Sequence, residues 1–343
     1  MNAVRDALPL LMAGRDLTQD MARAAMAAIM GGECTDSQIG AFLAAMRMKG
    51  ETGDEIAAFA EVMRDSALFI PCAAGAVIDT CGTGGDCLDT FNISTTAAFI
   101  AAGAGARVAK HGNRAISSRC GSADVLRALG VDIEAPPEVV GHCLDEIGVG
   151  FLFASILHPA MRHAIGPRRE IGVRTVFNVL GPLTNPARAP RQVMGVFAPE
   201  LVPTMAHALA RVGSEFALVV HGDCGLDEIS TVSATTVAIV RDGCVTVESW
   251  EPEVFGVPRC RLEDIRGGEP EESARMLRAV LQGQPGPRTD IALANAAAAI
   301  WVAGLAEDIT DAMARARESL ESGAAMEKLL SLAAMTSEAP VDS

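Results

Sequence analysis

The sequence predicts an α/β protein in which a small helical N-terminal domain precedes a larger α/β domain with a mostly parallel central sheet. No strand-like alternation appears before Ala76, whereas short apolar runs alternate with helical stretches after it. The 343 residues exceed one average domain. Half of the residues are hydrophobic, yet only 4% are aromatic and none is Tyr, so the core must consist of aliphatic side chains and Met. This composition favours helices packed on a buried sheet.

The first 66 residues are predicted to form successive amphipathic helices. Each helix is expected to begin after a Thr that can accept hydrogen bonds from free backbone N–H groups, namely Thr18, Thr35 and Thr52. Gly31-Gly32 and Gly50 are expected to end the first two helices. The predicted helical domain covers residues 1–70 and is completed by helices within residues 160–190, and the predicted α/β domain covers residues 71–343.

Strands and helices alternate along the second domain. A buried strand at residues 77–79 is predicted to precede a Gly-rich loop and a helix at about residues 95–103. Further strands are predicted at residues 107–109, 150–154, 193–197 and 216–221, and further helices at residues 123–129 and 137–147. Such alternation implies parallel strands covered by helices.

The last third of the chain changes pattern. Asp242-Gly243 is a turn signal between two apolar runs, which predicts a hairpin of residues 237–240 and 245–247. Residues from 269 to about 335 return to a helical pattern, and residues 337–343 are expected to be frayed.

Charge is distributed unevenly along the sequence. The formal net charge of -15 argues against a nucleic-acid partner, because the phosphate backbone would be repelled. However, residues 90–123 contain no Asp or Glu and residues 151–199 contain only Glu170, while both stretches carry several basic residues. These stretches indicate a focused anion site or, alternatively, Arg-rich faces exposed to water.

Membrane and disulfide-rich classes do not fit the sequence. No apolar run approaches the roughly 20 residues that span a bilayer, and the first twelve residues, which include Asp6, make a poor signal peptide. We therefore expect no membrane partner and a cytoplasmic location. The nine Cys contain no Cys-x-x-Cys pair, so neither a disulfide framework nor a zinc site is predicted.

A Gly-rich loop comes directly after the first predicted strand. Gly82, Gly84 and Gly85 lie within five positions that end at Asp86. Ligands bind at this edge of α/β sheets, and glycine lets backbone N–H groups approach an anion closely. The loop is neither a Walker A motif nor a Gly-x-Gly-x-x-Gly motif, and taken alone it could be a structural turn.

Two further segments offer partners for a phosphate. Asn92-Ile93-Ser94-Thr95 precedes a helix, whose N-terminus suits an anion, although Ser94 could simply cap the helix. Lys110 begins a polar segment that ends at Ser118 and comes after a predicted strand. Because the chain has only three Lys among 28 basic residues, a compact Lys charge here fits a phosphate in a tight pocket.

Asp227 and Glu228 form an acidic pair just after the strand predicted to end at His221. Adjacent carboxylates at a strand end can hold Mg²⁺, which binds few protein oxygens together with substrate phosphates and water. The alternative is an ordinary exposed acidic loop.

Together, these segments resemble the anthranilate phosphoribosyltransferase family. The motifs, in order, are Gly82-Thr83-Gly84-Gly85-Asp86, Asn92-Ile93-Ser94-Thr95, Lys110-His111-Gly112-Asn113-Arg114, Gly121-Ser122-Ala123-Asp124, RTVFNVLGPL at residues 174–183 and Gly225-Leu226-Asp227-Glu228. Several motifs in the right order are more specific than any one, and the resemblance extends to the helix at residues 295–304. It implies a fold of the nucleoside phosphorylase/phosphoribosyltransferase type, a homodimer and a hinged cleft between the two domains.

The resemblance also implies an activity: transfer of the phosphoribosyl group of phosphoribosyl pyrophosphate (PRPP) to the amine of anthranilate in tryptophan biosynthesis, with two Mg²⁺ ions per subunit. The positions that match the family's PRPP site are Gly82, Gly85, Asp86, Thr90, Asn92, Ile93, Ser94, Thr95, Lys110, His111, Gly112, Asn113, Arg114, Ala115, Ile116, Ser117, Ser118 and Ser122. The positions that match its anthranilate site are Gly82, Asn113 and Arg168, with Arg169 the rival for the Arg that binds the carboxylate. The metal positions are Ser94, Asp227 and Glu228.

The sequence leaves alternatives open at two places and for the activity itself. Family members often carry more glycine after the Gly-Gly-Asp, whereas this chain has Cys87-Leu88-Asp89, whose Cβ atoms should stiffen the loop. His111 could act as a general base or could only orient its neighbours through hydrogen bonds. The rival activities are a pyrimidine nucleoside phosphorylase of related fold and a non-catalytic relative that binds nucleic acid.

Overall fold

The computed structural model describes residues 2–73, 75–115 and 119–337. Of residues 337–343, which were predicted to be frayed, Ser337 is instead the last residue of a helix, and residues 338–343 lie outside the described residues, as do the predicted PRPP contacts Ile116, Ser117 and Ser118. Within the described ranges, no helix is long and apolar enough to cross a bilayer.

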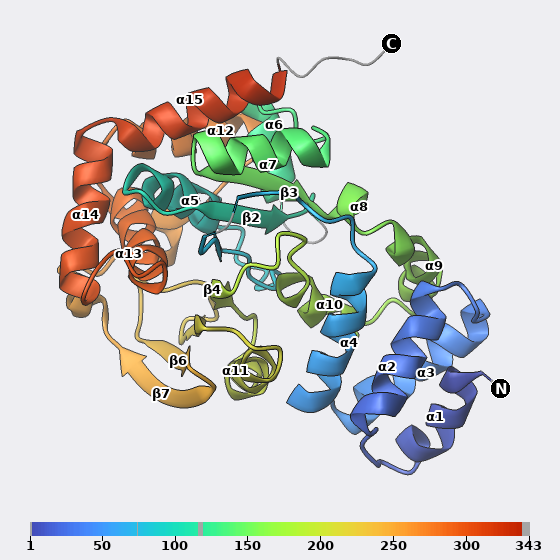
Figure 1. The fold of residues 1–343 in the computed structure, drawn as a ribbon. Helices are drawn as coiled ribbons and strands as arrows, with labels where there is room; N and C mark the ends of the chain where they lie inside the picture. The colour runs from blue at the N-terminus through green and yellow to red at the C-terminus, as the bar shows by residue number, and fades with distance from the viewer. Residues whose placement is uncertain (1, 74, 116–118, 338–343) are drawn as a thin grey trace.

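Four helices form the N-terminal bundle: α1 (Ala3–Met12), α2 (Gln19–Met30), α3 (Asp36–Lys49) and α4 (Gly53–Asp65) (Figure 1). Thr18, Thr35 and Thr52 cap α2, α3 and α4 as predicted, because each side chain accepts from a backbone N–H of the first turn. The prediction that a Thr opens every helix was wrong for α1, which begins after Asn2. The Asn2 side-chain oxygen accepts from the Val4 N–H at 3.0 Å.

Helices from the middle of the chain pack on this bundle. α9 (Arg162–Ile171) contacts α2 and α3, and the short α10 (Phe177–Leu180) contacts α4. Their buried residues belong to the same hydrophobic cluster as the bundle and as α11 (Leu201–Arg211). The division into a helical domain of residues 1–70, completed within residues 160–190, and an α/β domain stays a prediction.

A seven-stranded sheet forms the centre of the larger domain. Its strands are β1 (Ile78–Asp79), β2 (Val108–Gly112), β3 (Val149–Phe153), β4 (Arg191–Gly195), β5 (Phe216–Gly222), β6 (Thr235–Arg241) and β7 (Cys244–Trp250). The spatial order is β3-β2-β1-β4-β5-β6-β7. The first five strands in this order are parallel, and the predicted hairpin of β6 and β7 adds two antiparallel strands at one edge.

Strand boundaries differ from the prediction by up to three residues. β2 continues through Gly112 instead of ending at residue 109, because Lys110, His111 and Gly112 pair in register with residues 151–153 of β3. Lys110 and His111 therefore belong to the sheet and not to the loop after it. β4 begins and ends two residues earlier than predicted, so the chain leaves the sheet at Gly195.

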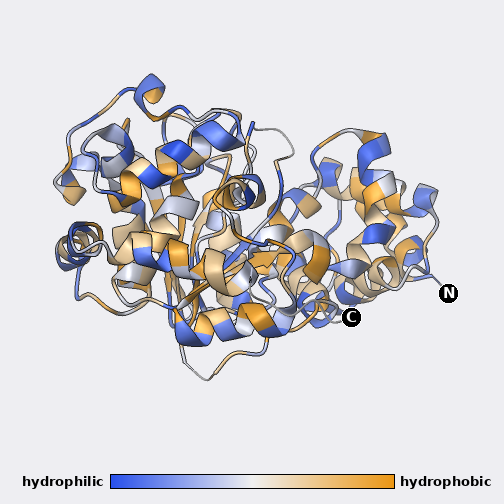
Figure 2. Ribbon diagram, turned by 90° about the horizontal axis from the view of Figure 1, so that it is seen from above, coloured by the Kyte–Doolittle hydropathy of each residue, from blue (hydrophilic) through white to orange (hydrophobic). Residues whose placement is uncertain are grey.

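Helices cover the faces of the sheet (Figures 1 and 2). α5 (Ile93–Gly103) and α13 (Pro287–Val302) are almost entirely buried and pack on each other, while α11 covers the opposite face beside the bundle. The remaining helices are α6 (Ser122–Ala128), α7 (Pro137–Glu146), α8 (Ala154–Leu157), α12 (Pro270–Leu281), α14 (Ile309–Glu321) and α15 (Ala324–Ser337). Because β1, β2, β4 and β5 are parallel, the loops after them meet at one edge of the sheet.

Candidate active site

The Gly-rich loop lies at the carboxyl end of β1, against the end of β4. The Thr83 N–H donates to the Gly195 carbonyl oxygen at 2.8 Å, and a Cβ atom at Gly82 would lie 3.0 Å from that same oxygen. Gly84 and Gly85 have φ angles of 64° and 84°, which glycine adopts without strain. The loop therefore needs its glycines both to approach β4 and to follow its own backbone path.

Three carboxylates gather beside this loop. Asp86 lies within hydrogen-bonding reach of Asp227, and Glu228 Oε1 accepts from the Ser94 N–H at 3.1 Å, at the start of α5. Burial, together with the charges of Asp86 and Glu228, raises the pKa of Asp227 well above its ordinary value. Burial also raises the pKa of Glu228 to about 7, against the opposing effect of Lys110. The charge of Lys110 therefore offsets only part of the effect of burial and of repulsion among the carboxylates.

Gly195 allows the two loops to meet. The loop that carries Asp227 comes after β5, and the loop that carries Asp86 comes after β1, with β4 between these strands. A Cβ atom at Gly195 would overlap the Asp227 carbonyl oxygen. A glycine at the end of β4 thus lets the Asp227 loop cross over it.

The donor set fits a hard divalent cation such as Mg²⁺. Asp86 Oδ2 is buried and has no hydrogen-bond partner within residues 2–73, 75–115 and 119–337, an uncommon state for a carboxylate oxygen. Mg²⁺ prefers oxygen ligands and would satisfy Asp86 Oδ2 while offsetting the repulsion between Asp227 and Glu228. The sequence analysis assigned Asp86 to the predicted PRPP site but did not group it with Asp227 and Glu228, because its nearness to Asp227 depends on how the loops cross in space.

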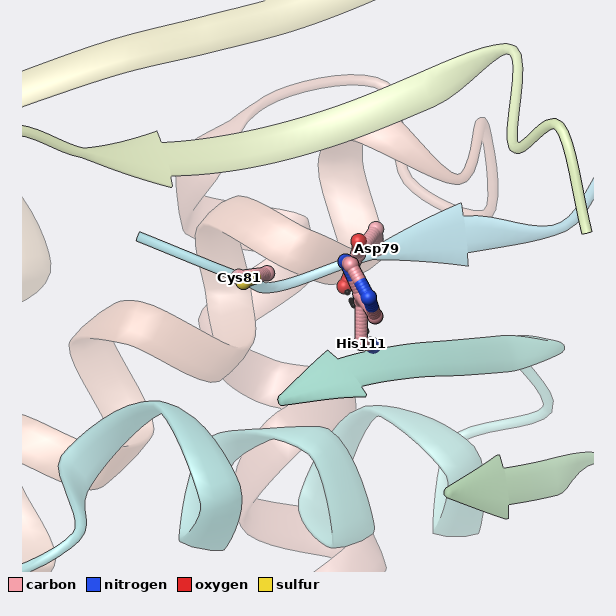
Figure 3. A group of neighbouring side chains, drawn as sticks. All are labelled: Asp79, Cys81 and His111. Carbon is pink, nitrogen blue, oxygen red and sulfur yellow. Dashed lines mark hydrogen bonds between the residues drawn. The ribbon is translucent and has the colours of Figure 1, made fainter. Parts of the chain in front are cut away.

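A second group of possible metal-ligand atoms lies inside the sheet, formed by Asp79, Cys81 and His111 (Figure 3). Asp79 already accepts from the His111 backbone N–H at 3.1 Å and from the Asn185 side-chain amide at 2.7 Å. Burial raises the pKa of the Cys81 thiol far above its ordinary value, so the sulfur stays protonated and is a poor ligand. We interpret the bond from His111 to Asp79 as a structural link between β2 and β1, whereas the Cys81 thiol donates to the Gly82 carbonyl oxygen.

Lys110 is buried between two carboxylates. Its Nζ donates to the carbonyl and hydroxyl oxygens of Thr80, at 3.1 and 3.2 Å. Burial raises the pKa of Asp79 to about 6, and the charge of Lys110 opposes this shift, as it does for Glu228. Lys110 therefore supplies positive charge at the sheet edge, and its contact with a phosphate stays a prediction.

Both ring nitrogens of His111 have a hydrogen-bond partner. Its Nδ1 lies 3.1 Å from the Gly181 carbonyl oxygen and its Nε2 lies 3.2 Å from Nε2 of His158. Because a carbonyl only accepts, we assign the His111 proton to Nδ1, so Nε2 accepts from His158. Burial and the nearby His158 lower the pKa of His111 to about 3. This geometry favours the orienting role of His111 over the general-base role.

Replacing His158 by Gln should cost stability at neutral pH and progressively less at lower pH. Burial lowers the pKa of His158 from 6.5 to about 4. As pH falls below 6.5, the unfolded chain binds a proton that the folded state binds only near pH 4, so this contribution to stability is lost across that window. We expect the unfolding free energy difference between wild type and His158→Gln, measured with urea, to shrink by roughly 2 to 3 kcal/mol. A constant difference would contradict a neutral, buried His158.

The loop after β2 holds the predicted PRPP contacts around Asn113. Asn113 Oδ1 accepts from the Arg114 N–H at 2.8 Å and from the Ser155 hydroxyl at 3.1 Å. The Ser122 hydroxyl donates to the Asn113 carbonyl oxygen at 3.3 Å, and the Ala115 N–H donates to Asp124 at 2.9 Å. These bonds fix a polar loop beside the start of α6.

The structure at the start of α5 excludes the alternative in which Ser94 only caps this helix. Ser94 does not cap this helix: the N-cap position is Asn92, whose side chain makes no capping hydrogen bond and instead donates to the Cys120 carbonyl oxygen at 3.1 Å. Asn92 Oδ1 is buried and has no hydrogen-bond partner in the described part of the chain. Thr90 pairs with Arg266 in an isolated bridge, while Ile93 and Thr95 are buried in α5. The side-chain oxygen of Asn92 therefore lies at the same edge of the sheet as the three carboxylates.

Arg168 and Arg169 differ in their surroundings on α9. The Arg168 guanidinium carbon lies 5.2 Å from the centre of the Phe177 ring, and burial lowers the pKa of Arg168 from its ordinary value. Arg169 is exposed. A half-buried guanidinium stacked on an aromatic ring is held in one orientation, as planar recognition of a carboxylate requires.

Comparison with known proteins agrees with this arrangement. Residues 5–67 match the family model of the glycosyl transferase family helical bundle domain, and residues 74–326 match its a/b domain. A curated anthranilate phosphoribosyltransferase of Anaeromyxobacter dehalogenans (strain 2CP-1) is 54% identical over 97% of this chain and 98% of its own. The chain belongs to the anthranilate phosphoribosyltransferase family. The Thermus thermophilus enzyme has a similar structure, with a TM-score of 0.92 and 45% identity over 98% of this chain and all of that one.

A more distant member of the anthranilate phosphoribosyltransferase family was solved with ligands. The Saccharomyces cerevisiae enzyme, in complex with PRPP and Mg, has a TM-score of 0.89 and 29% identity over 97% of this chain and 98% of its own. These matches confirm the predicted fold class, with a helical N-terminal domain and a larger α/β domain.

The loop that departs from the glycine-rich pattern of the family is strained. Cys87 and Asp89 have φ angles of 62° and 52°, in the left-handed region that favours glycine. Asp adopts positive φ angles more readily than most residues, whereas Cys has no such preference. The predicted stiffening by Cβ atoms therefore has a structural basis at two positions of the Cys87-Leu88-Asp89 segment.

Proposed function

We propose that this chain transfers the phosphoribosyl group of PRPP to the amine of anthranilate, which yields N-(5-phosphoribosyl)anthranilate and pyrophosphate in tryptophan biosynthesis. The observation that carries this proposal is the convergence of the family's motifs at one sheet edge in a chain about half identical to curated members over nearly its whole length. The positions predicted to bind PRPP, anthranilate and the metal are part of this proposal.

The residues suit a displacement at the ribose C1. The bond from C1 to pyrophosphate breaks as the bond from C1 to the amine nitrogen forms, so the leaving anion must be stabilised and a weak nucleophile aligned. The backbone N–H groups of Gly82 and Gly85, the N-terminus of α5 and the charge of Lys110 would stabilise the anion. Arg168 and Asn113 would align anthranilate. The amine proton can leave after bond formation, so the reaction does not require His111 as a strong base.

Magnesium fits the three carboxylates at this edge. We propose that Asp227, Glu228 and Asp86, with Ser94, hold two Mg²⁺ ions per subunit in the presence of PRPP. The ions would neutralise charge that builds up on the pyrophosphate. The protein's own part is to hold these carboxylates beside the Gly-rich loop, as the hydrogen bond from Ser94 to Glu228 does.

A homodimer is the proposed assembly, with contacts through the helical bundle. Met12 of α1, Met48 of α3 and Ile165 of α9 expose 80%, 88% and 53% of their surface. α3 contacts both α1 and α9, so these apolar side chains belong to adjoining helices. A cytoplasmic location, and the absence of a nucleic-acid partner, stay predictions.

The substrates that the enzyme consumes together distinguish phosphoribosyl transfer from the rival activity of a pyrimidine nucleoside phosphorylase. With PRPP, anthranilate and Mg²⁺, we expect one pyrophosphate for each anthranilate consumed, and a product whose mass is that of anthranilate plus one phosphoribosyl group. Ribose 1-phosphate formed from a pyrimidine nucleoside and inorganic phosphate would support the phosphorylase instead.

Chemical labelling of Cys87 tests the site without an activity measurement. Of the nine thiols, only Cys87 and Cys244 are exposed, and Cys244 lies on the edge strand β7. We expect PRPP with Mg²⁺, at ten times its Kd, to slow modification of Cys87 by about tenfold, because a closed loop shields the thiol. Cys244 provides the control within the same molecule, since its rate should not change. Equal rates for Cys87 with and without PRPP would contradict the proposed location of the PRPP site.

A further inference from the structure

We propose that Arg174 is a positioning residue that fixes the Gly-rich loop against the end of β4, so that its N–H groups and Asp86 are held ready for PRPP. This inference rests on the proposed function. Arg174 is the first residue of the motif at residues 174–183 and matches none of the predicted substrate or metal positions.

Two contacts join Arg174 to the loop and to β4. Its Nη2 donates to the Gly85 carbonyl oxygen at 2.6 Å, and its guanidinium carbon lies 4.1 Å from the centre of the Phe197 ring. Phe197 lies just after β4, and its own N–H donates to the Thr83 hydroxyl at 3.2 Å. The stack holds the planar guanidinium in one orientation, and the charged donor makes a stronger bond than a neutral one would. Arg174 and Phe197 thus hold the loop at two points, Thr83 and Gly85.

The contact at Gly85 lies next to a carboxylate of the proposed metal site. The next residue is Asp86, whose buried Oδ2 has no hydrogen-bond partner among the described residues, and Cys87 with its positive φ comes directly after it. Cys87 Sγ itself lies 3.9 Å from Arg174 Nη2. A strained residue favours any rearrangement that lets its φ become negative. A fixed carbonyl at Gly85 therefore keeps Asp86 in place beside Asp227 despite the strain one residue further on.

Folding of the chain depends little on the Arg174 side chain. Its side chain is exposed, so its removal leaves neither a cavity nor a buried polar group without a partner. It lies between Gly172, the C-cap residue of α9, and the start of α10, in a segment that connects two helices packed on the helical bundle. An exposed Arg that links two site segments points to a role in substrate binding.

Steady-state kinetics on three variants tests this role. For Arg174→Ala we expect the KM for PRPP to rise about tenfold, with kcat and the KM for anthranilate within about twofold of wild type. Phe197→Leu removes the stack and should raise the KM for PRPP by about threefold. The double variant should be no worse than Arg174→Ala, because Phe197 acts through Arg174. Arg174→Lys keeps the charge but loses the planar fork, so we expect it to stay close to Arg174→Ala.

Arg315→Ala is the matched control, because it removes an exposed Arg of α14 that pairs with Asp311 of its own helix. It should leave all constants unchanged. If wild type is active and Arg174→Ala keeps the wild-type KM for PRPP, the positioning role is wrong and the proposed function stands. A Lys variant with the wild-type KM would also overturn it, since charge alone would then suffice. A wild type that does not use PRPP would instead refute the proposed function.

Discussion

Asp227→Asn combined with Glu228→Gln is expected to lower kcat/KM for PRPP by roughly 100- to 1,000-fold at saturating Mg²⁺, the loss expected on removal of groups that stabilise transition-state charge. Both carboxylates lie beside Asp86, whose buried Oδ2 has no hydrogen-bond partner among the residues that the structure describes. The amides keep the shape of the side chains but remove two negative charges, so the cation would lose most of its attraction to the site. Initial rates over a range of PRPP and Mg²⁺ concentrations measure the effect.

The unfolding temperature provides a second test with the same double variant. Without a cation, the amides remove the repulsion among Asp86, Asp227 and Glu228, so the metal-free variant should unfold at a higher temperature than metal-free wild type. Mg²⁺ with pyrophosphate should raise the unfolding temperature of wild type but not that of the variant. Asp223→Asn is the control, because Asp223 is an exposed acid of the same turn. Wild-type rates in the double variant would show that the carboxylates do not hold the metal.

Arg168→Ala is expected to raise the KM for anthranilate by about 10- to 100-fold while changing kcat much less. Loss of a hydrogen-bonded charged partner costs about 1.5 to 3 kcal/mol, which corresponds to this range. The stack on Phe177 holds the Arg168 guanidinium in place, and burial makes a carboxylate partner more favourable than water. Initial rates with anthranilate varied at saturating PRPP give the constants.

Arg169→Ala is the matched variant for this prediction. Arg169 is the next residue of α9, carries the same charge and is exposed, so its replacement should leave the KM for anthranilate within about twofold of wild type. Arg168→Lys should recover only part of the affinity, because an ammonium cannot make two parallel hydrogen bonds to a carboxylate. An unchanged KM in Arg168→Ala, with a raised KM in Arg169→Ala, would move the role to Arg169.

The order of elements could be predicted from local sequence signals. Each Thr cap lies just before an apolar helical pattern, and the alternation of strands and helices implied the parallel sheet that β1 to β5 form. α1 was missed as a separate element because its cap is Asn2, close to the chain start, and Pro9 interrupts its pattern. The end of β2 was misplaced because Lys110 and His111 are polar, although their backbone pairs with β3.

The site was predictable as a set of motifs but not as a set of contacts. Residue types indicated that the loops after residues 79 and 221 could serve a phosphate and a metal. The approach of Asp86 to Asp227 depends on Gly195 at the end of β4, and no local signal relates these three residues. The same holds for Arg174, which lies 89 residues from Gly85 in the chain. Long-range contacts of this kind are set by strand order, which a single sequence does not encode locally.

The most direct test of the proposed activity measures anthranilate consumption with PRPP and Mg²⁺, and then omits each component in turn. We expect consumption only when the enzyme, PRPP and Mg²⁺ are all present, and one pyrophosphate released for each anthranilate lost. Adding excess chelator should stop the reaction, and restoring Mg²⁺ should restart it. Consumption of anthranilate that continues at the same rate without PRPP would contradict the proposed activity.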